Sequence, residues 1–234
     1  MFFVVNEHAG NGRALHVFQR IRPLLSAGDE IATTQGIGDG RRLAADAARA
    51  GHALVVAVGG DGTANEVVNG LAECGFRPAL GVIPAGGGND LAYSLRLPTD
   101  PERALEVLRR GSFRAIDLAL VSFDGGDRRR YYVNVLGMGL SGVIAALTRG
   151  KKRLGGPLTY GALLLAEMFR VKPVRFELSA DGEPVCQSAI AAHLANGRRE
   201  GRIFPVAPGA LLDDGLLDLT AVEDVPRPRR PGSP

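Results

Sequence analysis

The segment VVAVGGDGTANEVVNG, residues Val55–Gly70, joins an apolar run to a glycine-rich loop and then to a helical pattern. Every residue of Ala53–Val58 is apolar, which is typical of a central parallel strand covered on both faces. Beyond the loop, Val67, Val68 and Leu71 recur at helical spacing. A strand that leads through a loop into a helix is half of a βαβ unit, so this segment predicts a parallel α/β sheet.

The same alternation of strands and helices continues on both sides of this segment. Further strands are expected at Phe2–Val5 and Ala79–Ile83, and helices at Ala14–Leu25, at 38–51 and at 99–111. The last helix has Thr99 or Asp100 as its N-cap, Pro101 in its first turn and Gly111 as its stop.

From about Phe113 strand-like runs dominate. Two segments, 124–126 and 181–183, have the composition of hairpin turns, and one helix is expected around Leu158–Arg170. We therefore predict an α/β nucleotide-binding catalytic domain at 1–117, a mostly-β sandwich domain at 118–224 and a disordered tail at 225–234.

Composition narrows the class of protein. The 234 residues are 45% hydrophobic and 23% charged, with a net charge of +3, which indicates a globular chain. Cys74 and Cys186 lack metal-ligand spacing, and no signal peptide or membrane-spanning run is visible, so a cytoplasmic protein is expected. Membrane contact would then be peripheral. Aromatic and basic residues are not interleaved, which argues against nucleic acid as a partner. A homodimer is left open.

The loop after the central strand has a composition suited to phosphate. Gly59, Gly60 and Gly62 let a phosphate approach the backbone, and the N-terminus of the following helix favours an anion. Asp61 would repel that phosphate unless a cation lay between them, which indicates Mg²⁺. The structural alternative is that Asp61 caps the helix that begins at Thr63 or Ala64.

Two more loops repeat this pattern. Gly86, Gly87 and Gly88 follow the next strand and lead into Asn89 and Asp90, and a polar loop of residues 6–12 follows the first strand. Because the carboxyl ends of parallel strands meet at one edge of a sheet, the three loops should lie together. The sequence thus predicts a nucleoside triphosphate site with Mg²⁺.

The segments GGDGTANEVVNG and PAGGGNDLA together resemble the catalytic domain of the diacylglycerol kinase family, which includes sphingosine kinases. The resemblance extends through IDLALV (116–121), YYVNVLGMGLSG (131–142) and NGRREGRIFPVAPGALLDDGLLDL (196–219). It implies an N-terminal three-layer α/β domain like that of NAD kinases and phosphofructokinases, then a β-sandwich, with ATP bound in the cleft between them.

The resemblance also implies roles for individual residues. It assigns catalytic Mg²⁺ to Asp61, Asp90 and Asp117, and a second magnesium site to Asp214 with the backbone carbonyls around Leu211 and Leu216. The implied nucleotide contacts are Asn6, Ala9, Gly10, Thr34, Gly59, Gly60, Gly62, Thr63, Asn65, Glu66, Gly86, Gly87, Gly88 and Asn89. The acceptor would be the hydroxyl of diacylglycerol or a related lipid. The basic runs at 128–130 and 149–153 could contact an anionic membrane.

The sequence departs from the family pattern at several positions. Glu7 stands where proline is usual, and Gly87 stands where threonine or serine is usual. The Asp-Gly-Glu segment expected after Asp214 to supply a general base is missing, and Asp181–Glu183 precedes that position. The chain is therefore predicted to be a C-terminally truncated, ATP- and Mg²⁺-dependent lipid kinase. The alternatives are a truncated remnant that binds nucleotide or membrane without transfer and, more distantly, an NAD kinase.

Overall fold

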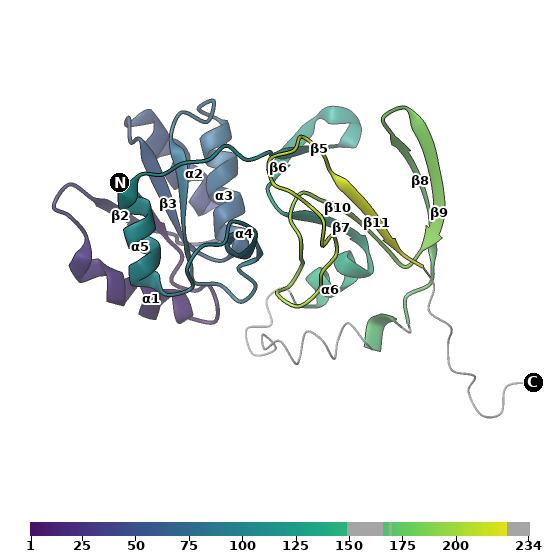
Figure 1. Ribbon diagram of the computed structural model, residues 1–234, viewed down its shortest axis with the longest axis horizontal. Coiled ribbons are helices and arrows are strands. Elements are labelled where there is room, and N and C mark those ends of the chain that lie inside the picture. The colour runs from purple at the N-terminus through teal and green to yellow at the C-terminus, as the bar shows by residue number, and fades with distance from the viewer. Residues whose placement is uncertain (149–165, 169, 224–234) are drawn as a thin grey trace, which may run out of the picture.

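The computed structural model describes residues 1–148, 166–168 and 170–223, and it contains two units arranged side by side (Figure 1). The N-terminal unit is built on a four-stranded parallel sheet in the order β2-β1-β3-β4. The strands are β1 (Phe2–Val5), β2 (Glu30–Thr33), β3 (Leu54–Gly59) and β4 (Ala79–Pro84). All six residues of β3 are buried and the strand is paired on both sides, so the predicted central strand is confirmed.

Helices cover both faces of this sheet, which gives the unit three layers. Alternate residues of each strand point to opposite faces. Val4 and Val55 pack with residues of α2 and α3, whereas Phe3 and Val56 pack with residues of α1 and α5. The helices are α1 (Arg13–Ile21), α2 (Asp39–Arg49), α3 (Asp61–Ala72), the short α4 (Asp90–Ser94) and α5 (Pro101–Arg110).

The predicted ends of α5 are confirmed. The side chain of Asp100 accepts a hydrogen bond from the backbone N–H of Arg103, and Gly111 ends the helix with a φ of 67°. The helix expected at Ala14–Leu25 is shorter. After Ile21 the chain tightens into a 3₁₀ turn, Arg22–Leu24, because Pro23 cannot donate the helical hydrogen bond.

The C-terminal unit is a β-sandwich of antiparallel sheets. Its central sheet has the order β11-β10-β7, and two hairpins, β5–β6 and β8–β9, lie beside it. The elements are β5 (Ala119–Phe123), β6 (Arg128–Tyr132), β7 (Val135–Gly139), α6 (Leu140–Thr148), β8 (Val174–Ala180), β9 (Glu183–Ala189), β10 (Ala191–Ala195) and β11 (Asp218–Val222). The predicted turn between β8 and β9 is confirmed, with positive φ at Asp181 and Gly182.

Some expectations were wrong. The strand-like run that begins at Phe113 forms a strand only from Ala119, because Ile116 and Leu118 instead pack against the core of the N-terminal unit. Helix α6 was not predicted. The helix expected around Leu158–Arg170, the basic run at 149–153 and the tail at 225–234 lie wholly or largely outside the described residues.

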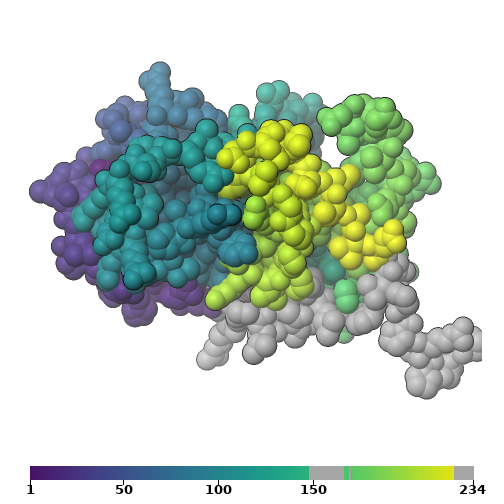
Figure 2. All heavy atoms as spheres, in the orientation of Figure 1, coloured from purple at the N-terminus to yellow at the C-terminus, as the bar shows by residue number. Residues whose placement is uncertain are grey.

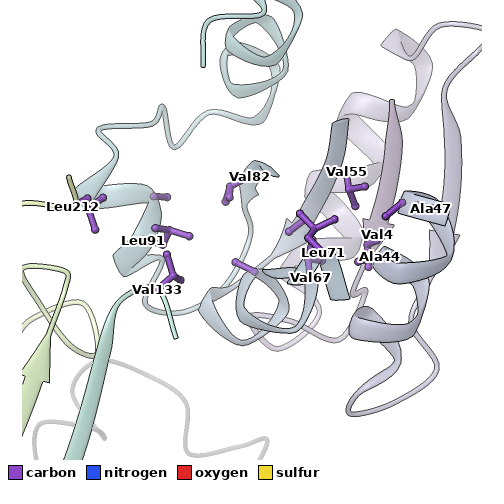
Figure 3. Close-up of a cluster of buried hydrophobic side chains, with 14 residues drawn as sticks. Val4, Ala44, Ala47, Val55, Val67, Leu71, Val82, Leu91, Val133 and Leu212 are labelled. Carbon is purple, nitrogen blue, oxygen red and sulfur yellow. The ribbon is translucent and has the colours of Figure 1, made fainter. Parts of the chain in front are cut away.

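The two units share a continuous core. Leu91 of α4 packs in one cluster with Val133 and Leu212 of the C-terminal unit (Figure 3). The side-chain amide of Asn69 adds a pair of hydrogen bonds across the junction, because it donates to Tyr131 O and accepts from Tyr131 N, both at 2.9 Å. The space-filling view shows the yellow C-terminal segment directly against the N-terminal unit (Figure 2). Within the described ranges, the helices are too short or too polar to cross a bilayer.

Candidate active site at the carboxyl ends of the parallel strands

The three polar loops meet at one edge of the parallel sheet, as predicted. Asn6, after β1, donates a hydrogen bond from Nδ2 to Oγ1 of Thr63 at 3.0 Å. The loop after β1 also approaches the loop after β4 so closely that a Cβ on Gly10 would lie 2.5 Å from Ala85 O. The site is therefore built from backbone segments that fix one another.

Four of the predicted phosphate-loop glycines form two pairs with different surroundings. Gly60 and Gly86 pack backbone to backbone, since a Cβ on Gly60 would lie 3.0 Å from Cα of Gly86 and one on Gly86 would overlap Gly60. A Cβ on Gly62 or Gly87 would meet nothing within 4 Å. The first pair is thus required for the contact between loops, whereas the second pair leaves open backbone that a ligand could approach.

Asp61 and Asp90 face the same point of this edge. Their Oδ2 atoms lie 2.9 and 3.0 Å from the position that a Cβ would take on Gly88. Oδ1 of Asp61 accepts a hydrogen bond from the backbone N–H of Leu91 at 3.0 Å. The interpretation of Asp61 as the cap of its own helix was wrong, because α3 begins at Asp61 and the bond goes to α4.

Asp90 is a buried carboxylate, with 4% of its surface exposed. Its Oδ1 accepts from the backbone N–H of Arg202 at 2.9 Å and lies 2.8 Å from Nε of Arg199. Burial, and then the negative charge of Asp61, raise the pKa of Asp90 to about 6, although the Arg202 N–H and the Arg199 charge act in the opposite direction.

Arg199 crosses from the C-terminal unit to the second glycine loop. Its guanidinium lies 3.6 Å from the centre of the Tyr93 ring, and Nη2 lies 3.4 Å from the carbonyl oxygens of Gly88 and Asn89. Its Nε–H is not directed at Asp90, so the contact with that carboxylate is an ion pair without a hydrogen bond. Neither Arg199 nor Arg202 was predicted as a site residue, and the one signal for them was their place in the family-like segment 196–219.

Asp117 is held by a different part of the chain. Its backbone N–H donates to Leu212 O at 2.6 Å, and its Oδ2 accepts from Gly215 N at 2.8 Å. Asp214 accepts the N–H of Leu216 on Oδ1 at 3.0 Å, and the side chains of Leu211 and Leu216 are exposed. Within the described ranges, no three Asp, Glu, His or Cys side chains are grouped to hold a metal ion. Magnesium roles for Asp117, Leu211, Asp214 and Leu216 stay predictions.

Other predicted nucleotide contacts have structural partners. Both carboxylate oxygens of Glu66 accept backbone N–H groups at the start of α2, from Gly38 at 2.8 Å and from Gly40 at 3.0 Å. Asn89 closes its own loop, since Oδ1 accepts from Gly86 N and Nδ2 donates to Gly86 O.

The surroundings of three further predicted nucleotide contacts, Thr34, Ala9 and Asn65, do not indicate a ligand. Thr34 is buried, Ala9 donates its N–H to Asn6 O, and Oδ1 of Asn65 is buried with no hydrogen-bond partner among the described residues. Contacts of these residues with a nucleotide, like those of Glu66 and Asn89, stay predictions.

The chemistry of the Asp61–Asp90 pair fits a hard divalent cation. Carboxylate oxygens are the protein ligands that Mg²⁺ prefers, and two carboxylates that face one point repel each other unless a proton or a cation lies between them. Burial raises the pKa of Asp90 most, and repulsion by Asp61 raises it further. The open backbone at Gly62 and Gly87 fits phosphate groups beside such a cation.

A second polar cluster anchors the segment that carries Arg199 and Arg202. Ser141 Oγ lies 2.9 Å from Nε2 of His193 and donates to Oε2 of Glu200 at 3.0 Å. The composition is that of a nucleophilic triad, but the single hydroxyl proton of the serine is directed to the carboxylate. His193 must then donate to Ser141, so the histidine is not placed to act as a base.

Comparison with known proteins agrees with this architecture. Residues 1–121 match the family model described as "Diacylglycerol kinase catalytic domain", and residues 134–230 match "YegS C-terminal NAD kinase beta sandwich-like domain". A protein of Chromohalobacter salexigens named "Probable lipid kinase YegS-like" is 38% identical over 189 residues, which are 79% of this chain and 58% of that protein.

A diacylglycerol kinase of Staphylococcus saprophyticus is 32% identical over 81% of this chain and 61% of its own length. The crystal structure of a diacylglycerol kinase from Bacillus anthracis str. Sterne matches with a TM-score of 0.73 at 26% identity, over 95% of this chain and 73% of that one. The chain spans between 58% and 64% of the length of the curated relatives that it matches.

Proposed function

The chain belongs to the diacylglycerol kinase family, and from this premise we propose that it is a lipid kinase that uses ATP and Mg²⁺. The acceptor that we propose is the free hydroxyl of diacylglycerol or a related lipid. The observation that carries the proposal is the Asp61–Asp90 pair, which faces one point between two glycine loops at the carboxyl edge of the parallel sheet.

Phosphoryl transfer requires that the nucleotide phosphates be positioned and their charge neutralised. In this proposal the open backbone at Gly62 and Gly87 would receive the phosphates, and the carboxylates of Asp61 and Asp90 would hold Mg²⁺. When bound there, Mg²⁺ neutralises the charge that develops on the transferred phosphoryl group. Arg202 N–H and Arg199 orient Asp90 through its other oxygen, Oδ1.

The lipid acceptor places the reaction at a membrane surface. Arg128, Arg129 and Arg130 are exposed on β6, and each basic side chain close to an anionic membrane contributes on the order of 1 kcal/mol to binding. We therefore propose peripheral attachment on the cytoplasmic side, where ATP is available.

The test is transfer of label from γ-labelled ATP, with Mg²⁺, into vesicles that contain diacylglycerol. Asp61→Asn removes one carboxylate of the pair, and Asp46→Asn, at an exposed position of α2, is the matched control. Label in phosphatidic acid that is lost in Asp61→Asn and kept in Asp46→Asn would support the proposal. Binding of ATP without any lipid label would contradict it, and so would label that appears instead in NADP when NAD is supplied.

A further inference from the structure

A small cavity lies next to the carboxylate pair, and the guanidinium groups of Arg198 and Arg202 in its lining have no role in the proposed phosphoryl transfer. It measures about 260 Å³ and is lined by Tyr93 from α4 and by residues of the segment 198–208. Figure 1 places α4 at the border with the C-terminal unit, so the cavity lies where the two units meet. The lining residues are Tyr93, Arg198, Arg199, Arg202, Ile203, Pro205 and Pro208.

The charged side chains that line this cavity are all positive. Three arginines contribute to it, and no carboxylate does. Asp90 balances one of the three through its ion pair with Arg199. Glu200, which lies between the arginines in sequence, is directed away from them to Ser141 and His193. Among the residues that the structure describes, the other two guanidinium groups have no carboxylate partner at the cavity. Guanidinium groups bind phosphate oxygens in a bidentate manner.

Two of the arginines are already held in place. Nε of Arg198 donates to Ala210 O at 2.8 Å, and Arg199 lies over the Tyr93 ring. The third, Arg202, is exposed, and its guanidinium has no hydrogen-bond or ion-pair partner in the part of the chain that the structure describes. A ligand would therefore have to order only one long side chain, which lowers the entropic cost of binding.

Arg202 also has an unusual backbone conformation, with a positive φ. Glu200 and Phe204 pair through their backbones and leave a three-residue turn with Arg202 in the middle, where φ is 77°. This left-handed region suits glycine and is strained for arginine, and strain of this kind is concentrated at functional sites. A glycine at position 202 would adopt this φ without strain and would keep the backbone N–H that donates to Asp90. The turn itself therefore does not require an arginine side chain.

We propose that this cavity is a binding site for a phosphate ester, with Arg202 as the residue that closes on the anion. The volume of about 260 Å³ has room for a phosphate with a short ester such as glycerol phosphate. The apolar lining by Ile203 and the two prolines is compatible with a free ester or with the headgroup of an anionic phospholipid. This binding does not depend on the kinase activity proposed above.

The test uses binding alone, measured on the full chain. Glycerol phosphate is titrated in a calorimeter, and vesicles of phosphatidylcholine with or without phosphatidylglycerol are used in a sedimentation assay. Arg202→Gly removes the guanidinium and relieves the strained φ. Arg96→Gly is the matched control, because Arg96 is also an exposed arginine with positive φ, at 55°, and does not line the cavity.

We expect Arg202→Gly to weaken binding at least tenfold and Arg96→Gly to change it less than twofold, with both variants at least as stable to heat as the unaltered chain. Loss of glycerol phosphate binding would assign the site to a free ester. Loss seen only with phosphatidylglycerol vesicles would assign it to a lipid headgroup. The proposal is overturned if the unaltered chain binds neither probe, if Arg202→Gly binds as well as the unaltered chain, or if both variants lose affinity equally.

Discussion

Arg199 and Asp90 belong to different units of the molecule, yet Nε of Arg199 lies 2.8 Å from Oδ1 of Asp90. The ion pair holds one oxygen of the carboxylate, and the other oxygen faces Gly88 together with Asp61. The junction between the units therefore bears directly on the protonation of the candidate site. Each part of this arrangement has a measurable consequence.

The first consequence is a loss of stability as the pH rises. The pKa of Asp90 is raised to about 6 in the folded chain from an ordinary value of 3.8, so the folded state holds this proton more tightly than the unfolded state. Stability from this source is complete below about pH 4 and is lost as the pH rises through about 6. The loss should be roughly 2–3 kcal/mol. Urea unfolding at several pH values, without divalent cations, measures it.

The control for this experiment is Asp90→Asn, which keeps an oxygen for the Arg202 N–H but does not titrate. The difference in unfolding free energy between the two proteins should therefore depend on pH in this window. A difference that stays constant from pH 4 to pH 7 would show that Asp90 titrates normally.

Magnesium should restore part of the folding stability that is lost as Asp90 ionises. At pH 7 Asp61 and Asp90 are both charged and face one point, so a divalent cation between them would relieve their repulsion. We expect Mg²⁺ to raise the melting temperature of the unaltered chain and to have little effect on Asp61→Asn. The gain should shrink below pH 6, where a proton takes the place of the cation. An equal rise in both proteins would refute a site at this pair.

Removing the cation of the interdomain pair should shift the titration of Asp90. In Arg199→Met the apolar part of the side chain is kept and the charge is lost, so the pKa of Asp90 should rise further above its ordinary value. At pH 7 the uncompensated carboxylate should cost about 3 kcal/mol of stability, and less at pH 5. Arg198→Met is the control, because Arg198 bonds to a backbone carbonyl and not to Asp90. Equal pH profiles for the two variants would contradict this role.

The glycines of the two loops should respond to alanine in opposite ways. Gly86→Ala places a Cβ into Gly60 and should destabilise the fold by about 1–3 kcal/mol, as forced overpacking does. Gly62→Ala has free space in the first turn of α3 and should raise stability by up to about 1 kcal/mol. If phosphate approaches the open backbone, Gly62→Ala should nevertheless bind ATP more weakly, and thermal unfolding with and without ATP separates the two effects. Unchanged ATP affinity would place the nucleotide elsewhere.

Three of the four strands of the parallel sheet, and its helices, were predictable because their signals are local, whereas the edge strand β2 (Glu30–Thr33) was not predicted. The uniformly apolar run before Gly59 is typical of a buried parallel strand, and the caps at Asp100 and Gly111 mark both ends of α5. The meeting of Asp61 and Asp90 also followed, since the ends of adjacent parallel strands must share an edge.

What could not be predicted depends on contacts between distant segments. Arg199 and Arg202 reach Asp90 only because the C-terminal unit docks beside α4, and a single sequence contains no pattern for that docking. For the same reason the pattern around Ile116 was misread as a strand, since its apolar residues pack against the core of the other unit. Glu66 was assigned to a nucleotide through the family resemblance, and that contact stays a prediction; no pattern in the sequence indicated that its carboxylate accepts the backbone N–H groups of Gly38 and Gly40 at the start of α2.

The last prediction concerns Ser141, whose neighbours are those of a hydrolase although its hydrogen bonds are not. Its hydroxyl donates to Glu200 and receives from His193, and the serine is buried. Ser141→Ala should cost about 1–3 kcal/mol, because Glu200 and His193 lose a buried partner. Ser122→Ala, at an exposed position of β5, should change stability by less than about 0.5 kcal/mol. A fluorophosphonate probe, which reacts with activated serines, should leave Ser141 unlabelled, since no base is free to take its proton. Labelling of this residue, detected by mass spectrometry, would mean that the bonds to Glu200 and His193 are exchanged in solution and that the cluster is a nucleophilic site.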